Sequence, residues 1–409
     1  MRRKYLALDI WENADNGDYI RLFSLILTVM LGYFASLSFM FQLPRLVLML
    51  GGNESEAGFL LGTTLFADVV LSPLAGFLVA RFAFRPLLLF GLITYTLSTG
   101  LMCLVDTVGQ TLYIVRFMQG VGHAFIYVPC FTVVSAIIPT ERKASGLAMF
   151  AISVQIGNLI GSLMGAIIIE NLDVTWFFLA AVGWTVVAMV PATRVWSPTL
   201  KTPGLISGGK GGGLAPGFLA GVVFSLVIGG AFCTVMQFIP TYFDRLYNIG
   251  ILARPLSAST FLSSALASMV TIRLLIGRAG DGKFRRQLAF GSCATVIFSI
   301  AMIPVIQGMY TSILLGVLFG CGYGLLYPTV MALILSNLCA RNAGTPVGIL
   351  ASAYQVGYLG IPFLLGPSIE LLGYNATFVM VACALLGSWT IFVLCNGPVR
   401  SWFFVSSQA

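Results

Sequence analysis

The sequence predicts an all-helical protein that crosses a membrane many times. Only 9% of its 409 residues are charged, 58% are hydrophobic, and the mean hydropathy is +0.97. A soluble domain carries about 25% charged residues, so this chain has too few charges to cover a water-facing surface of its size. Its apolar residues form continuous blocks long enough for a helix to cross roughly 30 Å of hydrocarbon, whereas a membrane β-barrel shows short alternating segments.

Twelve such blocks follow one another along the chain, and each predicts one membrane-spanning helix. The preceding residues 1–19 are polar and mixed in charge, so we expect a cytosolic lead-in rather than a cleavable signal. The predicted spans are 20–43, 57–80, 86–105, 111–138, 144–169, 175–193, 216–240, 256–277, 287–307, 310–336, 343–369 and 375–395.

The positive residues fall on one side of these spans. With the N-terminus inside, only Arg45, Arg245 and Arg254 of the 22 Lys and Arg residues lie outside, and Arg116 lies within a span. This is the positive-inside distribution, and a shift by one helix would invert it. We therefore expect both termini in the cytoplasm and a plasma-membrane location, or the inner membrane in a Gram-negative bacterium. The net charge of +8 then reflects topology, and no nucleic-acid partner is expected.

One long polar, Gly-rich internal segment divides the chain. We expect an N-terminal bundle at 1–194, a cytoplasmic linker at 195–215 and a C-terminal bundle at 216–409, because the composition of 195–215 is typical of a flexible linker. The two halves match at an offset of 200 residues, for example Arg85 with Arg285 and Glu170 with Glu370. Matches at polar residues in one register indicate two parallel six-helix repeats, a known transporter architecture.

Polar side chains gather on one face of the span 111–138. Arg116, Gln119, His123 and Tyr127 are three or four residues apart, which places them on one face of a helix. A polar stripe inside a membrane must face a cavity or another helix. The stripe therefore either lines a cavity or joins this helix to its neighbours.

Asp68 is an acidic residue within a predicted span. Counting at 1.5 Å per residue places Asp68 and His123 near mid-membrane, with Arg116 roughly 10 Å nearer the outside. Our hypothesis is that Asp68, Arg116 and His123 form a proton-coupling group, since ionisable residues inside membranes are candidates for function. The alternative is a static pair of Asp68 with Arg116 or His123. Arg273 lies at a helix end and is expected to be only a topology anchor.

The second half has no equivalent charged stripe. At the matching positions it offers aromatic residues, which would form an amphipathic wall suited to a partly apolar organic solute, although such a stripe also serves packing. A strongly dianionic solute is not expected, because it calls for several Arg or Lys groups. The candidate substrate-binding residues of both halves are Gln119, Tyr127, Tyr33, Gln237, Tyr323, Tyr327, Tyr354 and Gln355.

Several stretches resemble signature motifs of the major facilitator superfamily. The motif R-x-x-Q-G-x-G is complete in the span 111–138. The family's loop motif, roughly G-x-x-x-D-R-x-G-R-R, has two partial copies, "GFLVARFAFRP" and "GRAGDGKFRR". In the first, Ala80 replaces the acid. The residues that match the loop motif are Gly76, Arg81, Arg85, Gly277, Asp281, Arg285 and Arg286.

The resemblance covers nearly the whole chain and is strongest to drug- and metabolite-efflux branches. It implies the superfamily fold, with the first, fourth, seventh and tenth helices lining a central cavity, and a gating role for the loop-motif residues. It also implies a proton-coupled secondary active transporter that moves a small organic solute by alternating access, with efflux favoured. The alternatives are a nutrient or siderophore importer, or a non-transporting receptor or scaffold.

The sequence gives no sign of an enzyme or a cofactor. The "GGKGGG" at 208–213 lacks the Ser or Thr of a phosphate-binding loop, and the eight cysteines are scattered singly, so neither a nucleotide nor a metal site is expected. The expected partners are a small-molecule substrate, protons and the lipid bilayer. We expect the chain to act as a monomer.

Overall fold

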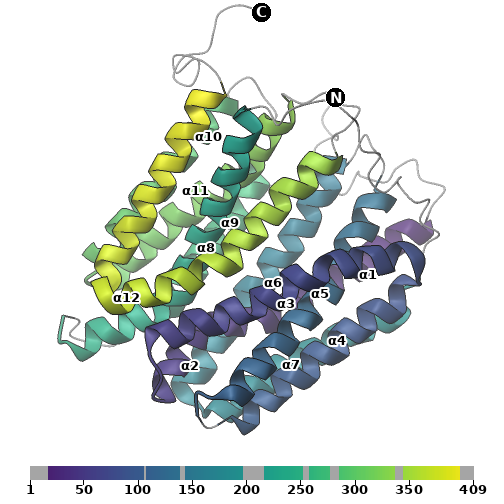
Figure 1. Cartoon of the computed structure of the whole chain (residues 1–409), viewed down its shortest axis with the longest axis horizontal. Helices are drawn as coiled ribbons and strands as arrows, with labels where there is room; N and C mark the ends of the chain where they lie inside the picture. Colours follow the sequence, from purple (N-terminus) through teal and green to yellow (C-terminus); the bar gives the residue numbers. More distant parts are fainter. Residues whose placement is uncertain are drawn as a thin grey trace, which may run out of the picture. The chain divides into compact units, whose positions relative to one another are not determined.

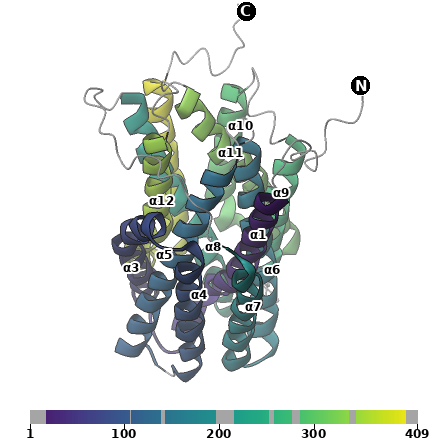
Figure 2. The same cartoon turned by 90° about the vertical axis from the view of Figure 1, so that its right-hand side faces the viewer.

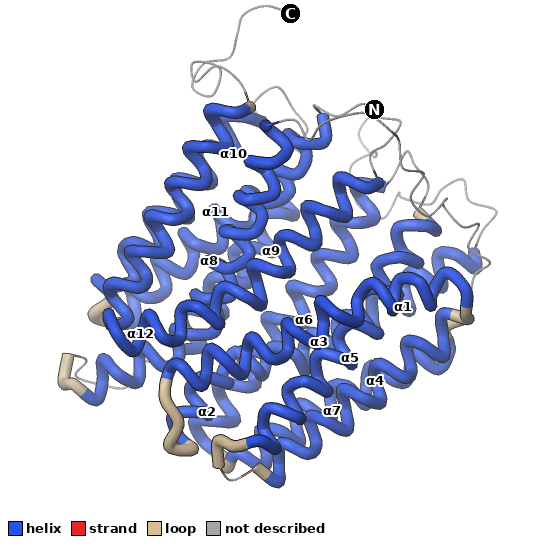
Figure 3. Tube along the Cα trace, in the orientation of Figure 1, coloured by secondary structure: helices blue, strands red, loops and turns tan. Residues whose placement is uncertain are grey.

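The computed structural model describes residues 17–105, 107–138, 143–196, 216–251, 258–276, 285–336 and 344–396. Every regular element in these ranges is a helix (Figure 3), which confirms the predicted class. Ten of the helical stretches are long and apolar enough to cross a membrane, and Thr260–Leu275 is a shorter apolar helix. Most of the predicted linker, at 197–215, lies outside the described residues.

The helices follow the predicted spans along the chain (Figure 1). The first half contains α1 (Gly17–Leu37), η2 (Ser38–Gln42), α2 (Leu43–Met49), α3 (Glu54–Arg81), α4 (Phe84–Leu101), η3 (Met102–Leu104), α5 (Gln110–Ile137), α6 (Lys143–Asn171) and α7 (Val174–Arg194). The second half contains α8 (Pro216–Asn248), α9 (Ala258–Ile276), α10 (Arg285–Met302), η6 (Ile303–Val305), α11 (Met309–Ser336) and α12 (Gly344–Cys395).

Two helix ends differ from the prediction. The first span continues through η2 into α2, where Pro44 occupies the first turn, a position that tolerates a missing N–H. The seventh span continues past Pro240 to Asn248. The last two predicted spans share the label α12, but Gly373 between them has a φ of 81° and a non-helical conformation, so α12 consists of two helices that meet at a kink. This left-handed conformation favours glycine, which has no Cβ.

By their contacts, the described residues form two compact units. The first contains α1, α3 from Phe66 onward, and α4 to α7. The second contains Met40–Leu65 together with α8 to α12. The segment Met40–Leu65 therefore packs with the second half of the sequence, in part through contacts of α2 with α8.

Close backbone contacts hold the first unit together. Helix α4 contacts both α5 and α7 (Figure 2), and α1 packs on α6 and α7. Gly157 and Gly161 of α6 lie so close to α1 that an added Cβ would collide with the carbonyl oxygens of Leu31 and Ala35 respectively. Small residues four apart are what allows helix backbones to approach in this way.

The second unit repeats this packing. Gly357 of α12 lies against the Leu226 carbonyl of α8, as Gly157 lies against α1, so the repeat of 200 residues recurs in three dimensions. Gly316, Gly320 and Gly324 of α11 face α9 closely, leaving no room for a Cβ. Each unit is thus built around glycine contacts that hold its helices at short range.

Candidate functional site

A cluster of titratable side chains lies inside the first unit. His123 of α5 is buried, and its Nδ1 lies 2.6 Å from the Tyr33 hydroxyl oxygen of α1. Asp68 of α3 is 5% exposed and accepts a hydrogen bond of 3.2 Å from the Ser72 hydroxyl. Asp68 also interacts electrostatically with His123. The structure therefore brings together Asp68 and His123, which the depth count places at the same level.

Arg116 and Gln119 face a different neighbour. The Arg116 guanidinium donates to the Gln119 side-chain oxygen, and the Gln119 amide donates to the Thr99 hydroxyl of α4 at 3.1 Å. Arg116 also interacts electrostatically with Tyr95 of α4. Among the described residues, no interaction joins Arg116 to Asp68. The predicted stripe thus divides, because its first two residues connect α5 to α4 whereas His123 contacts α1 and lies near Asp68 of α3.

Aromatic rings extend from His123 along α5. The rings of His123 and Tyr127 stack at a centroid distance of 5.6 Å, and those of Tyr127 and Phe131 stack at 6.1 Å. Tyr127 is half-buried and interacts electrostatically with Asp68. The Tyr33 ring contacts the Tyr95 ring edge-on at 5.0 Å. Tyr33 and Tyr127 thus belong to the same cluster as Asp68 and His123.

A second cluster, which we call the aromatic cluster, lies in the second unit. The hydroxyl oxygens of Tyr323 and Tyr354 are 2.6 Å apart, and the Tyr327 ring lies 4.7 Å from that of Tyr354. Phe232 of α8, which the sequence analysis did not single out, stacks on Tyr323 at 4.5 Å. The full cluster, drawn from α8, α11 and α12, consists of Phe232, Phe319, Tyr323, Tyr327, Tyr354 and Tyr358.

The two predicted glutamines lie on helices that carry this cluster. Gln355 is half-buried directly after Tyr354 on α12. Gln237 of α8 is buried, and its side-chain oxygen has no hydrogen-bond partner among the described residues. An unsatisfied buried acceptor is costly, so such groups mark positions where a ligand or water can bind.

The loop-motif residues are only partly described. Gly76 of α3 faces Val128 of α5, and an added Cβ would be 3.7 Å from its side chain. Arg81 lies 4.4 Å above the Phe77 ring, and Arg85 is exposed in the first turn of α4. Arg285 and Arg286 are half-buried in the first turn of α10, while Gly277 and Asp281 lie outside the described residues.

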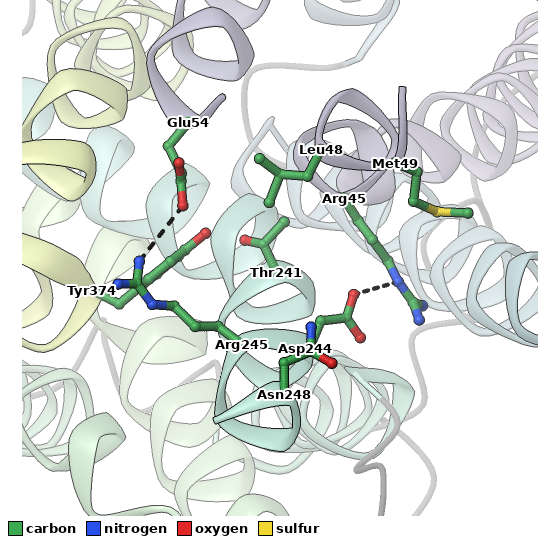
Figure 4. Close-up of a pocket in the computed structure, with 9 residues that line it drawn as sticks. All are labelled: Arg45, Leu48, Met49, Glu54, Thr241, Asp244, Arg245, Asn248 and Tyr374. Carbon is green, nitrogen blue, oxygen red and sulfur yellow. Dashed lines mark ion pairs between the residues drawn. The ribbon is translucent and has the colours of Figure 1, made fainter. Parts of the chain in front are cut away.

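A pocket of about 430 Å³ opens between α2 and α8 of the second unit (Figure 4). Two ion pairs form its walls, with 2.6 Å between Arg45 Nε and Asp244 Oδ2 and 3.7 Å between Arg245 Nη1 and Glu54 Oε1. The Arg245 guanidinium also lies 5.6 Å from the Tyr374 ring centroid. Asp244 and Arg245 are adjacent on α8 and carry opposite charges. Asp244 pairs with Arg45 before the loop 50–53, and Arg245 pairs with Glu54 after it. These two ion pairs hold Met40–Leu65 on the second unit.

These features define a class of protein. The chain has two repeated units, and their helices are long enough to span a membrane. One unit contains buried ionisable groups, and the other contains a cluster of aromatic rings and hydroxyls. These are the features of a multi-pass membrane transporter. The chain belongs to the Major Facilitator Superfamily, whose family model matches residues 24–362.

Individual relatives are distant. A Yersinia pseudotuberculosis protein named "Putative multidrug resistance protein MdtD" is 22% identical over 372 residues, which cover 77% of this chain and 79% of the relative. The crystal structure of the human organic anion transporter MFSD10 (TETRAN) matches with a TM-score of 0.68 at 13% identity, covering 92% of this chain and 99% of that one. A bacterial homologue of the human lysosomal transporter Spinster, in an inward-facing and unoccupied conformation, matches with a TM-score of 0.69 at 11% identity, covering 93% and 97%. These structures confirm the superfamily fold.

Proposed function

We propose that this transporter is proton-coupled and moves a small organic solute by alternating access, with efflux as its favoured direction. The observation that carries the proposal is the burial of Asp68 beside His123 in the first unit. Ionisable groups inside a membrane cost several kcal/mol, and in transporters they mark proton relays. A carboxylate and an imidazole that interact electrostatically can exchange a proton with whichever side of the membrane has access to them.

The neighbours of this pair have supporting roles in the proposed cycle. The Tyr33 hydroxyl lies at hydrogen-bond distance from His123 Nδ1 and so orients the imidazole ring, since it can donate to a bare Nδ1 or accept from a protonated one. The Ser72 hydroxyl donates to Asp68 and orients the carboxylate. Arg116 bonds to Gln119 instead, and its proposed contribution is to fix α5 against α4.

The solute is proposed to bind the aromatic cluster of the second unit. Its rings offer flat apolar surface, and the hydroxyls of Tyr323, Tyr327 and Tyr354 offer hydrogen bonds, a combination that suits a partly apolar organic molecule. Gln237 and Gln355 add polar groups nearby on the same helices. The name of the MdtD relative supports export of such a compound.

The remaining parts of the proposal concern orientation and gating. The distribution of Lys and Arg supports an orientation with both termini in the cytoplasm. The protein itself is proposed to lie in the plasma membrane. Arg81, Arg85, Arg285 and Arg286 lie at the helix ends where the loop motif is expected to control a gate. The functional unit is proposed to be a monomer in the bilayer, with protons and the solute as its partners.

Transport by purified full-length protein in proteoliposomes tests the proposal. An imposed pH gradient should drive accumulation of at least one compound from a panel of amphipathic drugs and metabolites. Asp68→Asn should abolish this accumulation, because an amide cannot exchange a proton, but should leave exchange of labelled for unlabelled solute without a gradient. Full pH-driven accumulation by the Asp68→Asn protein would contradict proton coupling through Asp68.

A matched carboxylate serves as the control. Asp173 is exposed and precedes α7 as its N-cap residue, where asparagine caps a helix about as well as aspartate. Asp173→Asn should therefore transport as the unmodified protein does. The orientation of the protein in the vesicles then distinguishes export from uptake, because only one direction is driven by a gradient of a given sign.

A further inference from the structure

Arg273 turns toward the interior of the second unit. It lies in the last turn of α9, a position from which a long basic side chain usually reaches the membrane surface. Its Nε instead donates a hydrogen bond of 2.9 Å to the Gly324 carbonyl of α11. The guanidinium also interacts electrostatically with Tyr323, Tyr327 and Tyr354. The positive charge of Arg273 is therefore directed at the aromatic cluster.

The glycine contacts explain this orientation. An added Cβ at Gly324 would come close to the Met269 carbonyl oxygen and the Ile272 side chain, so α11 and α9 touch at this level. The Gly324 carbonyl is then within reach of a side chain that starts one residue after Ile272. Tyr323 and Tyr327 lie on the same stretch of α11 as Gly324, so a guanidinium held by this carbonyl lies near enough to interact with them electrostatically.

Within the described ranges, the charge of Arg273 has no carboxylate partner. Among the described residues, no Asp or Glu forms an ion pair with Arg273, and its only hydrogen bond uses Nε. The donors on its two terminal nitrogens thus make no hydrogen bond within the part of the chain that the structure describes. A half-buried cation is stable only when a counter-charge or several hydrogen bonds compensate its lost hydration, and the tyrosine hydroxyls are neutral.

We infer that Arg273 binds the acidic group of the transported solute, and that the solute is an amphipathic organic monoanion with a flat apolar body. The two terminal nitrogens of a guanidinium match the two oxygens of a carboxylate. The side chains of Tyr327 and Tyr354 are only half-buried, so part of their surface is accessible to the apolar body of the same molecule. A single uncompensated cation calls for one negative charge. This inference rests on the proposed function, since it names the class of solute.

Equilibrium binding of two isosteric probes tests the inference. The full-length protein in phosphatidylcholine nanodiscs is titrated with radiolabelled 1-naphthoate, which carries one negative charge, and with 1-naphthamide, which is neutral and nearly the same shape. We expect naphthoate to bind about tenfold or more tightly than naphthamide, and Arg273→Gln to remove this preference, because hydrogen bonds between charged groups are the strong ones. Arg273→Lys keeps the charge and should retain part of the preference.

Arg194→Gln is the matched control. Arg194 also occupies the last turn of a helix, α7, but is exposed, so its replacement should leave both affinities unchanged. Circular dichroism and the thermal midpoint of each variant establish that it is folded. An unchanged preference for naphthoate in folded Arg273→Gln would overturn the inference. Loss of naphthoate binding when phosphatidylglycerol is added to the nanodiscs at a salt concentration that screens repulsion between the lipid surface and the probe would also overturn it, because Arg273 would then bind lipid headgroups.

Binding at equilibrium needs neither a pH gradient nor turnover. If Asp68→Asn still accumulates solute in a pH gradient, the proposed proton coupling fails, but the protein can still prefer naphthoate to naphthamide through Arg273. Conversely, a proton-driven transporter whose two probe affinities are equal retains the proposed function and loses only the inferred solute class. The two experiments therefore fail independently.

Discussion

Breaking the ion pair between Arg45 and Asp244 should loosen Met40–Leu65 from α8. The two atoms are 2.6 Å apart, and the side chains are 21% and 39% exposed. A hydrogen bond between charged groups contributes about 1.5–3 kcal/mol when shielded from water, whereas an exposed pair contributes about 0.2–1 kcal/mol. Because the Arg45 and Asp244 side chains are partly exposed, we expect their coupling free energy to be about 1 kcal/mol. This corresponds to roughly a fivefold change in the equilibrium constant for detachment of Met40–Leu65 from α8.

Hydrogen exchange followed by mass spectrometry measures this opening on the amides of α2. A double-mutant cycle of Arg45→Ala, Asp244→Ala and the combined variant gives the coupling between the two side chains. The exchanged pair, Arg45→Asp with Asp244→Arg, should recover most of the lost protection. High salt should reduce the coupling, because the screening length falls to about 3 Å at 1 M.

The second ion pair of the same pocket is the internal control. Glu54 and Arg245 are 3.7 Å apart, and the Arg245 side chain is 51% exposed, so their coupling should stay below about 0.5 kcal/mol. A coupling between Arg45 and Asp244 within about 0.3 kcal/mol of zero would refute the reasoning. Equal couplings for the two pairs would refute it as well, since distance and burial would then have no influence.

Two further predictions concern the first unit. Tyr33→Phe removes the hydroxyl bonded to His123 and should cost about 1 kcal/mol of stability. It should also shift the ¹⁵N resonance of Nδ1 of this single histidine, and an unchanged spectrum would contradict the assigned bond. Gly161→Ala should lower the thermal midpoint by colliding with the Ala35 carbonyl. Gly183→Ala, whose added Cβ meets nothing within 4 Å, should gain up to about 1 kcal/mol of helix propensity; equal midpoints for the two variants would argue against the close contact.

The helices themselves could be predicted because a membrane imposes a length on each apolar block. The boundaries that differ have local causes that hydropathy does not report. Pro240 lies inside α8, since a proline is tolerated where neighbouring helices support the backbone. Gly373 separates the two helices of α12 by its backbone conformation, and it lies between the two last predicted spans.

The proximity of Asp68 and His123 could also be predicted, because counting residues along two helices that cross the same layer gives their relative depth. Depth does not give direction around the helix axis, however. Arg116 lies on the same predicted stripe, yet it bonds to Gln119, which in turn reaches Thr99 of α4. That contact depends on how α4 and α5 pack, and a single sequence does not contain this information.

Arg273 shows the same limit. Its position at a helix end predicts a topology anchor, and the structure turns it toward α11 instead. A usable signal was present in the sequence, since Gly316, Gly320 and Gly324 are four residues apart and mark a face of close approach. Which helix meets that face, and therefore which side chain reaches the Gly324 carbonyl, is decided by the tertiary fold.

The ion pairs between Met40–Leu65 and α8 also determine how this contact responds to voltage. Arg45 and Glu54 carry opposite charges on one partner, as do Asp244 and Arg245 on the other. One elementary charge moved through 100 mV changes the free energy by about 2.3 kcal/mol. When the two partners separate, each carries one paired charge of each sign, so the electrical work on them nearly cancels. The membrane potential therefore has little effect on the free energy of separating Met40–Leu65 from α8.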